Sequence, residues 1–367
     1  MDRIESFLKS LFSALAIAAL LCIASPSSAG VLDGDGIATY GDSMTMQYSF
    51  WVPGGQLYGL DVYSDGTQLN WVDHLVMSGY NFGPQAFLES FAINRYSLAI
   101  AAAHTEDLHY MYENFGPEIT PGEAKLTVMN IGANDIGDIY GMVYNRAAAP
   151  GYNALADVDV QNFLSNEMAN ITEAVDYTLA FDPSMHMIMT TLPDLAITTS
   201  YLNRYTNPAQ RDAVTPVVQE FNNRILALAA SHGFPVVDLY NLAKIASAPP
   251  ELAGVQILTG PGTTGDHVFL SDGFHPGTVL QGLLANTVLM ANQLGYGDAA
   301  AFVSDQTIIT RAGLTPVGPG PTYFDVTPYV ILTNVPEPST MVLAGMAGAC
   351  LLVAARKRHG RKTNNRA

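Results

Sequence analysis

The sequence predicts an α/β domain in which a mainly parallel sheet lies between two layers of helices. Short β-branched or apolar runs alternate with longer segments whose apolar residues recur at helical spacing. Strand and helix alternate along most of the chain, which is typical of parallel sheets covered on both faces. No internal repeat interrupts this order. We therefore expect one three-layer α/β/α sandwich.

The individual elements follow from these patterns. The apolar runs predicted as strands cover residues 37–40, 97–101, 126–131, 185–191 and 235–239. The amphipathic segments predicted as helices cover residues 160–181, 208–232 and 278–294. Together they place the core domain within residues 30–296.

The chain changes character after residue 294. Residues 315–321 are too rich in Pro and Gly for a helix or a central strand, so they indicate a linker. Residues 324–332 fit either an edge strand or a spacer, and the sequence leaves both open. We assign residues 297–334 to a C-terminal extension that includes this linker.

Residues 1–29 have the pattern of a secretory signal peptide. Basic residues come first, residues 11–23 form an apolar stretch too short for an ordinary spanning helix, and residues 27–29 are small, as a cleavage site requires. An ordinary N-terminal helix is the alternative. We expect the mature chain to begin near Gly30.

Residues 335–367 form a second segment of this kind. A Val-Pro-Glu-Pro-Ser-Thr run leads into the apolar residues 341–355, and a basic cluster follows from Arg356 to Lys362. The apolar run is at or below the low end of the ~17–25 residues that cross a bilayer, and the basic cluster favours the cytoplasmic side. These residues predict a short membrane helix with a basic tail.

This arrangement resembles the PEP-CTERM sorting signal of biofilm-forming Gram-negative bacteria. In proteins with this signal, an exosortase recognises the tail in the membrane and removes it. The resemblance implies an exosortase-type processing partner and a transient membrane anchor. It also implies a final location at the cell surface or in the extracellular matrix of a Gram-negative-type bacterium.

Composition excludes several kinds of site from the mature chain. Cys22 and Cys350 both lie in the terminal segments, which excludes a disulfide, a zinc–cysteine site and a cysteine nucleophile. Residues 1–29 and 336–367 hold eight of the 16 Lys and Arg residues but three of the 33 Asp and Glu residues, so the remainder has a net charge of −22. Such a surface repels nucleic acid, and we expect no nucleic-acid partner.

Ser43 directly follows the first predicted strand, in the run Gly41-Asp42-Ser43. Open α/β folds place their sites at the carboxyl ends of parallel strands. Gly41 lets the backbone turn sharply, and the amides after it can face an anion. A plain turn or a helix N-cap is the alternative for such a tripeptide. Ser43 is therefore a candidate nucleophile, which needs a base to remove its proton.

His275 is the candidate base that takes the proton from Ser43. Asp272 precedes it by three residues on a short loop, so its carboxylate can hold one ring nitrogen and leave the other for Ser43. One alternative is a loop histidine satisfied by local hydrogen bonds. Another is a metal site with Asp266 and His267, but no further ligands at familiar metal spacing accompany them. We expect no metal and no cofactor.

The third motif, Gly132-Ala133-Asn134-Asp135, also follows a predicted buried strand. The side-chain amide of Asn134 is a donor of the kind that an oxyanion needs in acyl transfer. Both Asn134 and Asp135 could instead cap the next helix. We assign that capping role to Asp135.

These three motifs, in this order and each after a strand, resemble those of the SGNH/GDSL hydrolase family. The family's nucleophile motif matches residues 41–43, its Gly-x-Asn-Asp motif residues 132–135, and its Asp-x-x-His motif residues 272–275. Softer matches occur at residues 64–73 and 191–194. The resemblance covers residues 37 to 294 and implies a flavodoxin-like sandwich that hydrolyses esters.

One block departs from the family pattern. The expected Asn-x-Ala-x-x-Gly stretch corresponds to residues 97–102, with Ser97 in place of Asn and Ala102 in place of Gly. The resemblance implies an oxyanion hole made by the N–H groups of Ser43 and Ala102 with the amide of Asn134. An alanine can supply this N–H group if its φ is negative.

The predicted function is hydrolysis of a carboxylic ester through an acyl-enzyme on Ser43. The resemblance implies lipids, aryl esters or acylated polysaccharides as substrates, and Tyr48, Phe50 and Trp51 could line a pocket for them or belong to the core. The alternative is an inactive surface or matrix protein that binds polysaccharide with the same fold, as the altered Ala102 block would suggest. A metal-dependent phosphoesterase would need more carboxylate and His ligands than the sequence offers.

Overall fold

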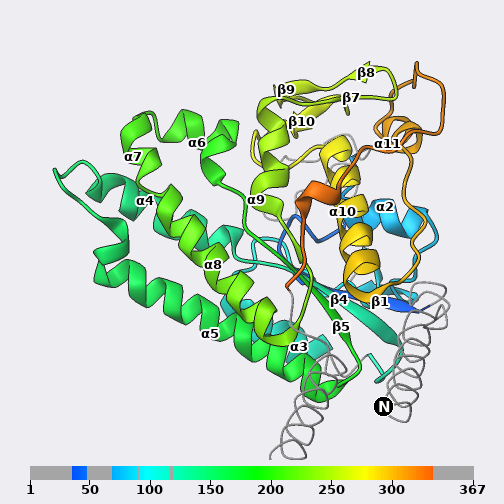
Figure 1. Ribbon diagram of the computed structural model, residues 1–367, viewed down its shortest axis with the longest axis horizontal. Coiled ribbons are helices and arrows are strands. Elements are labelled where there is room, and N and C mark those ends of the chain that lie inside the picture. Colours follow the sequence, from blue (N-terminus) through cyan, green and yellow to red (C-terminus); the bar gives the residue numbers. More distant parts are fainter. Residues whose placement is uncertain (1–34, 48–67, 89–90, 116–118, 334–367) are drawn as a thin grey trace, which may run out of the picture.

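The computed structural model describes residues 35–47, 68–88, 91–115 and 119–333 (Figure 1). A five-stranded sheet forms its centre, in the order β1-β4-β5-β6-β11. The first four strands are parallel, and the last pairs antiparallel with β6. The strands are β1 (Gly36–Gly41), β4 (Ala124–Asn130), β5 (His186–Thr190), β6 (Val236–Val237) and β11 (Val330–Ile331). This mainly parallel sheet confirms the predicted fold class.

Helices cover both faces of the sheet. Successive strand residues point to opposite sides, so each face presents its own apolar side chains to the helices. Tyr40 of β1 packs in the core formed with α3 (Leu108–Phe115), α5 (Val158–Phe181) and α8 (Thr215–His232). Its neighbour on the other face, Ile37, packs in a second core. That core is completed by α2 (Trp71–Met77) and α10 (Thr278–Tyr296). The result is the expected three-layer sandwich.

The remaining elements connect these layers or lie at their edges. The α-helices among them are α4 (Ala133–Arg146), α6 (Thr199–Arg204), α7 (Pro208–Asp212), α9 (Leu239–Leu242) and α11 (Asp305–Arg311). The 3-10 helices are η3 (Thr105–Asp107), η5 (Ala154–Ala156), η6 (Leu195–Ile197), η7 (Ala243–Ser247) and η8 (Thr327–Tyr329). Three small sheets pair β2 (Gln85–Leu88) with β3 (Phe91–Asn94), β7 (Glu251–Leu252) with β8 (Val255–Gln256), and β9 (Leu258–Pro261) with β10 (His267–Phe269).

Three predicted elements differ from the structure. The strand expected over 97–101 is wrong, because the segment forms only one isolated bridge, Thr39 to Ser97, before it turns. The helix expected over 208–232 is two helices, and α8 restarts with Pro216 in its first turn, where the missing N–H group of a proline does no harm. The strand expected over 235–239 is shorter, because α9 begins at Leu239.

The segment after α10 packs against the sandwich. Ile308 of α11 is fully buried in a third apolar cluster, against α10. A Cβ atom at Gly282 of α10 would lie 2.8 Å from the Ile308 side chain, so glycine permits this close approach. Arg311 donates a hydrogen bond of 2.7 Å to the carbonyl oxygen of His74 in α2. Of the two alternatives for residues 324–332, the edge strand is present as β11.

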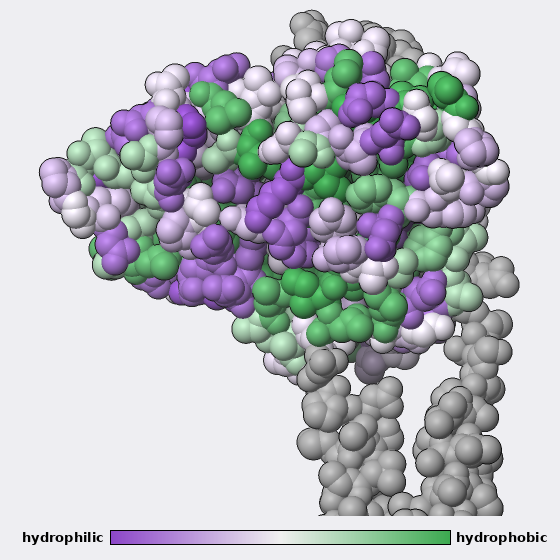
Figure 2. Space-filling model, turned by 45° about the horizontal axis from the view of Figure 1, so that its top comes forward, coloured by the Kyte–Doolittle hydropathy of each residue, from purple (hydrophilic) through white to green (hydrophobic). Residues whose placement is uncertain are grey.

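Both terminal segments and both cysteines lie outside the described residues, as do Tyr48, Phe50 and Trp51. Within the described part, no helix has the length and apolar character needed to cross a bilayer. Figure 2 shows hydrophilic and hydrophobic residues interspersed over most of one face, with a hydrophobic patch at its lower centre. The large hydrophobic residues that are exposed come from separate elements, among them Met77, Tyr110, Val158 and Leu258.

Candidate active site

The turn after β1 brings Ser43 to the carboxyl edge of the sheet. A Cβ atom at Gly41 would lie 2.6 Å from the carbonyl oxygen of Asn130, so only glycine allows β1 and β4 to approach here. The carbonyl oxygen of Asp42 accepts hydrogen bonds from the N–H groups of Thr45 (3.0 Å) and Met46 (2.9 Å). This tight turn fixes the direction of the Ser43 side chain.

Asp42 is a buried carboxyl group directly beside the candidate nucleophile. Its side chain is 2 % exposed, and its Oδ1 accepts a hydrogen bond of 2.9 Å from the N–H group of Met44. Burial raises the pKa of Asp42 to about 6, because the charged form loses its hydration, although the Met44 hydrogen bond and the nearby His275 oppose the shift. Asp42 thus supports the turn at a cost in desolvation.

His275 lies against Ser43 although 232 residues separate them in the sequence. Its Nε2 is 2.8 Å from Oγ of Ser43. Its Nδ1 is hydrogen-bonded to Oδ2 of Asp272. Both Ser43 and His275 are buried, with less than a tenth of each side chain exposed. The structure therefore brings together the three side chains that the sequence proposed as nucleophile, base and carboxylate, in the geometry of a serine hydrolase.

The loop between β10 and α10 sets this geometry through local bonds. Oδ1 of Asp272 accepts hydrogen bonds from the N–H groups of Phe274 (2.9 Å) and His275 (3.1 Å). Gly273 has a φ of +67°, where a side chain is disfavoured, and its carbonyl oxygen accepts a bond of 3.0 Å from Ser200. Burial acts to raise the pKa of Asp272, but the His275 ring and the two N–H groups outweigh it and hold the pKa below its usual value. Asp272 is therefore an anion that can stabilise a protonated imidazole.

Asn134 approaches the same edge from the start of α4. Gly132 stands at the N-cap with a φ of +114°, so the chain reverses here from β4 into the helix. Nδ2 of Asn134 donates a hydrogen bond of 2.9 Å to the carbonyl oxygen of Ala103. A primary amide has two N–H bonds, so one donor remains for a substrate.

Asp135 does not cap its own helix, which corrects the role predicted for it. Its Oδ1 accepts hydrogen bonds from the backbone N–H group of Thr105 (3.0 Å) and from the Thr105 hydroxyl (3.1 Å). The N-cap of α4 is a glycine with no side-chain cap. Because Thr105 begins η3, Asp135 fastens the first turn of α4 to η3.

Ala102 adopts a φ of +60°, so the negative φ under which we expected it to supply an N–H group is absent. It lies in a turn closed by a hydrogen bond of 3.1 Å from the N–H group of Ala103 to the carbonyl oxygen of Ile100. The N–H group of Ile100 donates 3.0 Å to the carbonyl oxygen of Gly41, which fastens this turn beside Ser43. Turns that need positive φ at their third residue normally use glycine, so the alanine here is strained.

An apolar pocket adjoins these residues. It encloses about 510 Å³, counting the space at its opening. Met44, next to Ser43, and Phe274 and Pro276, on either side of His275, form part of its wall. Leucines of η6, α9 and α10 and Ala243 line much of the rest. The sequence did not predict this pocket, because its lining comes from four separate stretches of the chain: residue 44 and residues 193–198, 239–243 and 269–284.

Residues 39–278 match the model of the GDSL-like lipase/acylhydrolase family. The chain belongs to this family. It is therefore an ester hydrolase, as the sequence predicted. Residues 334–358 match the PEP-CTERM protein-sorting motif, which indicates export and exosortase-dependent sorting to the cell surface.

Solved structures of lipases and esterases resemble this GDSL-family chain. An extracellular lipase from Streptomyces rimosus is 16% identical, with a TM-score of 0.39 over 66% of this chain and 92% of that one. Phospholipase A1 from Streptomyces albidoflavus is 17% identical, with a TM-score of 0.38 over 66% and 92%. The acetylxylan esterase Axe2 from Geobacillus stearothermophilus is 14% identical, with a TM-score of 0.40 over 72% and 96%. Among proteins with curated descriptions, none matches this chain significantly.

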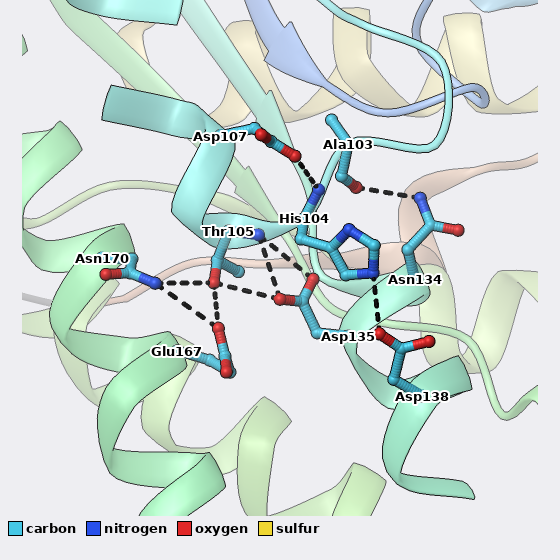
Figure 3. A network of polar contacts seen from close by, with 9 residues as sticks. All are labelled: Ala103, His104, Thr105, Asp107, Asn134, Asp135, Asp138, Glu167 and Asn170. Carbon is cyan, nitrogen blue, oxygen red and sulfur yellow. Dashed lines mark hydrogen bonds and ion pairs between the residues drawn. The ribbon is translucent and has the colours of Figure 1, made fainter. Parts of the chain in front are cut away.

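Two further observations complete the site of this GDSL-family chain. Among the described residues, no group of three or more His, Cys, Asp or Glu side chains is placed to hold a metal ion. Asp266 instead accepts a hydrogen bond of 2.6 Å from the Thr264 hydroxyl. Sequence reasoning missed Thr105, Glu167 and Asn170, which belong to no motif. Thr105 is hydrogen-bonded to Asp135, and Glu167 and Asn170 both contact the Thr105 hydroxyl (Figure 3).

Proposed function

We propose that this exported ester hydrolase forms an acyl-enzyme on Ser43. His275 takes the proton of Ser43 through Nε2 as Oγ attacks the ester carbonyl, and later gives it to the leaving alcohol. Water then attacks the acyl-enzyme with the same base. The 2.8 Å contact between Oγ of Ser43 and Nε2 of His275 carries this proposal, since a base must reach the proton that it removes.

The oxyanion of the tetrahedral intermediate would be held by the N–H groups of Ser43 and Ala102 and by the amide of Asn134. Ala102 stays in this proposal although its φ is positive and not negative as expected, because the Ile100–Gly41 hydrogen bond fastens its turn beside Ser43. Support comes from the Asn134–Ala103 hydrogen bond, which directs the Asn134 amide along the turn that contains Ala102. Each such donor is worth on the order of 10²–10³ in rate when it is preorganised. The strained Ala102 turn is thus a functional part of the site.

The substrate would be an ester whose acyl group is an apolar chain. The pocket wall is one residue away in sequence from both Ser43 and His275, and twelve of its fourteen lining residues are apolar. Burial of alkyl carbons contributes about 0.8 kcal/mol per methylene group, so a chain in this pocket strengthens binding with length. Short O-acetyl groups of polysaccharides, and aryl esters, would gain less.

The location would be the outer surface of a Gram-negative-type cell, after transient anchoring by the C-terminal tail. The sorting motif and the basic residues behind its apolar run support this placement. The acidic mature chain favours neutral or cationic partners over nucleic acid.

A fluorophosphonate probe tests this function and separates it from a polysaccharide-binding protein without activity. We expect stoichiometric labelling at Ser43 and none in Ser43→Ala, together with hydrolysis of p-nitrophenyl esters that improves with chain length. Folded wild-type protein that resists the probe and cleaves no ester would contradict the proposal.

A further inference from the structure

The hydroxyl group of Thr105 lies at the centre of a polar cluster, two residues after Ala103 in the chain (Figure 3). Its Oγ1 is 3.1 Å from Oδ1 of Asp135, forms a hydrogen bond with Oε2 of Glu167, and accepts 3.1 Å from Nδ2 of Asn170. Thr105 is fully buried, while Glu167 and Asn170 reach it from α5. Three separate parts of the chain therefore meet at one oxygen atom.

The geometry of this cluster limits how the Thr105 hydroxyl proton can be shared between two carboxyl groups. A hydroxyl group has one proton to donate, and it already accepts from Asn170. Two carboxyl groups, of Asp135 and Glu167, lie against it. Only one of them can accept the hydroxyl proton, so the cluster is best satisfied when the other carries a proton and donates it to Oγ1.

Glu167 is the carboxyl group that carries this proton. Burial raises the pKa of Asp135 as well, but Asp135 also accepts from the backbone N–H group of Thr105, at 3.0 Å, and this bond favours its anionic form. Burial above all, and then the neighbouring Asp135, raise the pKa of Glu167 to about 7 against the opposing effects of Thr105 and His104. A chain of hydrogen bonds thus runs from Glu167 through Thr105 to Asp135.

This chain of bonds ends three residues from Ala102, whose positive φ needs external support. A non-glycine residue in that region costs of order 1–3 kcal/mol and persists only where its surroundings determine the conformation. Asp135 holds the backbone of Thr105, Asn134 holds the carbonyl of Ala103, and Asp107 accepts 2.8 Å from the N–H group of His104. The residues after Ala102 are therefore fastened one after another.

We propose that Thr105, Asp135, Glu167 and Asn170 form a proton-dependent brace that positions the N–H group of Ala102 for the oxyanion. They are positioning residues, and the inference rests on the proposed function of Ser43. When Glu167 loses its proton, the two carboxylates repel each other across Thr105, η3 moves, and the Ala102 turn relaxes. The oxyanion hole then weakens as the pH rises.

Other charged groups face the brace from the same elements. His104 is 3.1 Å from Asp138 of α4, on the outer side of the cluster, and Asp107 lies at the end of η3. His104 acts to lower the pKa of both Asp135 and Glu167. Burial and the Asp135 charge oppose this effect and favour the proton on Glu167.

The test compares the pH dependence of kcat in wild type and Glu167→Gln with a p-nitrophenyl ester. The glutamine amide donates to Oγ1 of Thr105 at every pH, as the protonated acid does. We expect the ratio of kcat in Glu167→Gln to kcat in wild type to rise about tenfold from pH 6 to pH 9, a fraction of what one oxyanion donor is worth. KM should stay level. Glu113→Gln, which removes an exposed carboxylate that pairs with His109, should leave the profile unchanged.

A second pair of variants separates positioning from mere stability. Glu167→Ala should lower kcat at all pH values, and Ala102→Gly should restore part of it, because glycine adopts positive φ without strain. The brace would be overturned if Glu167→Ala lowered kcat equally in the wild-type and Ala102→Gly proteins. A ratio of kcat in Glu167→Gln to kcat in wild type that stays constant across the pH range would overturn it too. Failure of the proposed function differs, since wild type itself would then neither label at Ser43 nor hydrolyse esters.

Discussion

Asp272 holds His275 through both of its carboxylate oxygens. Oδ2 bonds to the ring Nδ1, and Oδ1 accepts 3.1 Å from the backbone N–H group of the same histidine. One side chain therefore sets both the position of the loop and the orientation of the imidazole. Because the two contacts use different oxygen atoms, a substitution can remove the contact that orients the imidazole and keep the one that positions the loop.

Asp272→Asn should abolish most of the activity while it preserves the fold. The asparagine oxygen can still accept from the N–H groups of Phe274 and His275, but its NH₂ group cannot accept from Nδ1 of the ring. We expect kcat to fall by about 10⁴-fold, the cost of a wrong histidine tautomer in a serine triad. Steady-state kinetics with a p-nitrophenyl ester measure it.

The matched control is Asp325→Asn. Asp325 is exposed and also accepts through Oδ1 from a backbone N–H group, that of Thr327 at 3.0 Å. It should keep wild-type kcat. A loss of less than tenfold in Asp272→Asn would mean that His275 is not oriented by this carboxylate.

Asp42→Asn should change how stability depends on pH. The folded-state pKa of Asp42 is raised to about 6 by burial, so the folded protein binds a proton that the unfolded chain has released. Its contribution to stability is complete below the unfolded pKa and is lost as the pH rises through about 6. Asparagine has no such titration and can still accept from the N–H group of Met44.

Urea unfolding at a series of pH values measures this difference. The free energy of unfolding of wild type should decrease by up to roughly 3 kcal/mol relative to Asp42→Asn between pH 4 and pH 7, as a shift of about two pKa units implies. Parallel curves for the two proteins would show that Asp42 is not titrated in this range.

Ala243→Leu should shorten the acyl chain that the enzyme accepts. Ala243 lines the apolar pocket and has room in front of it, so a larger side chain occupies space that an alkyl chain needs. We expect kcat/KM to fall about 10- to 100-fold for a long-chain ester and little for the acetate, since a few buried methylene groups are worth 1–3 kcal/mol. Ala209→Leu, at an exposed position of α7, is the control. An equal loss for acetate and long-chain ester would place the acyl group elsewhere.

The sequence predicted that the site lies at one edge of the sheet, because its motifs stand directly after strands. Ser43 and Asn134 each follow a buried parallel strand, and parallel strands end at one edge. His275 comes from a loop far away in sequence, yet its Asp-x-x-His spacing marked it. Local spacing in the sequence was therefore enough to identify Ser43, Asp272 and His275 as candidates.

The Ala102 turn and the residues around Thr105 could not be predicted in the same way. A positive φ at Ala102 contradicts the local preference of alanine, and the bonds that fasten the residues after it, from Asn134 to Ala103 and from Thr105 to Asp135, come from α4. Glu167 and Asn170 lie one helical turn apart on α5, where such residues are usually solvated. Only the tertiary structure brings them to Thr105.

The last prediction concerns the C-terminal limit of the folded domain. Sequence composition placed this limit at residue 296, but Ile308 and Ile309 of α11 are fully buried and β11 extends the sheet. A chain that ends at residue 296 exposes these contacts and breaks the Arg311 bond to His74. Loss of two buried isoleucines alone costs roughly 4–10 kcal/mol, comparable to the 5–15 kcal/mol that stabilises a domain.

We therefore expect a chain of residues 30–333 to unfold at the same temperature as the chain that ends at residue 367, and a chain of residues 30–296 not to fold cooperatively. Thermal unfolding by circular dichroism distinguishes them. Removal of the tail by an exosortase near residue 334 would then release a complete hydrolase domain. A chain of residues 30–296 with wild-type melting temperature would show instead that α11 and β11 are dispensable.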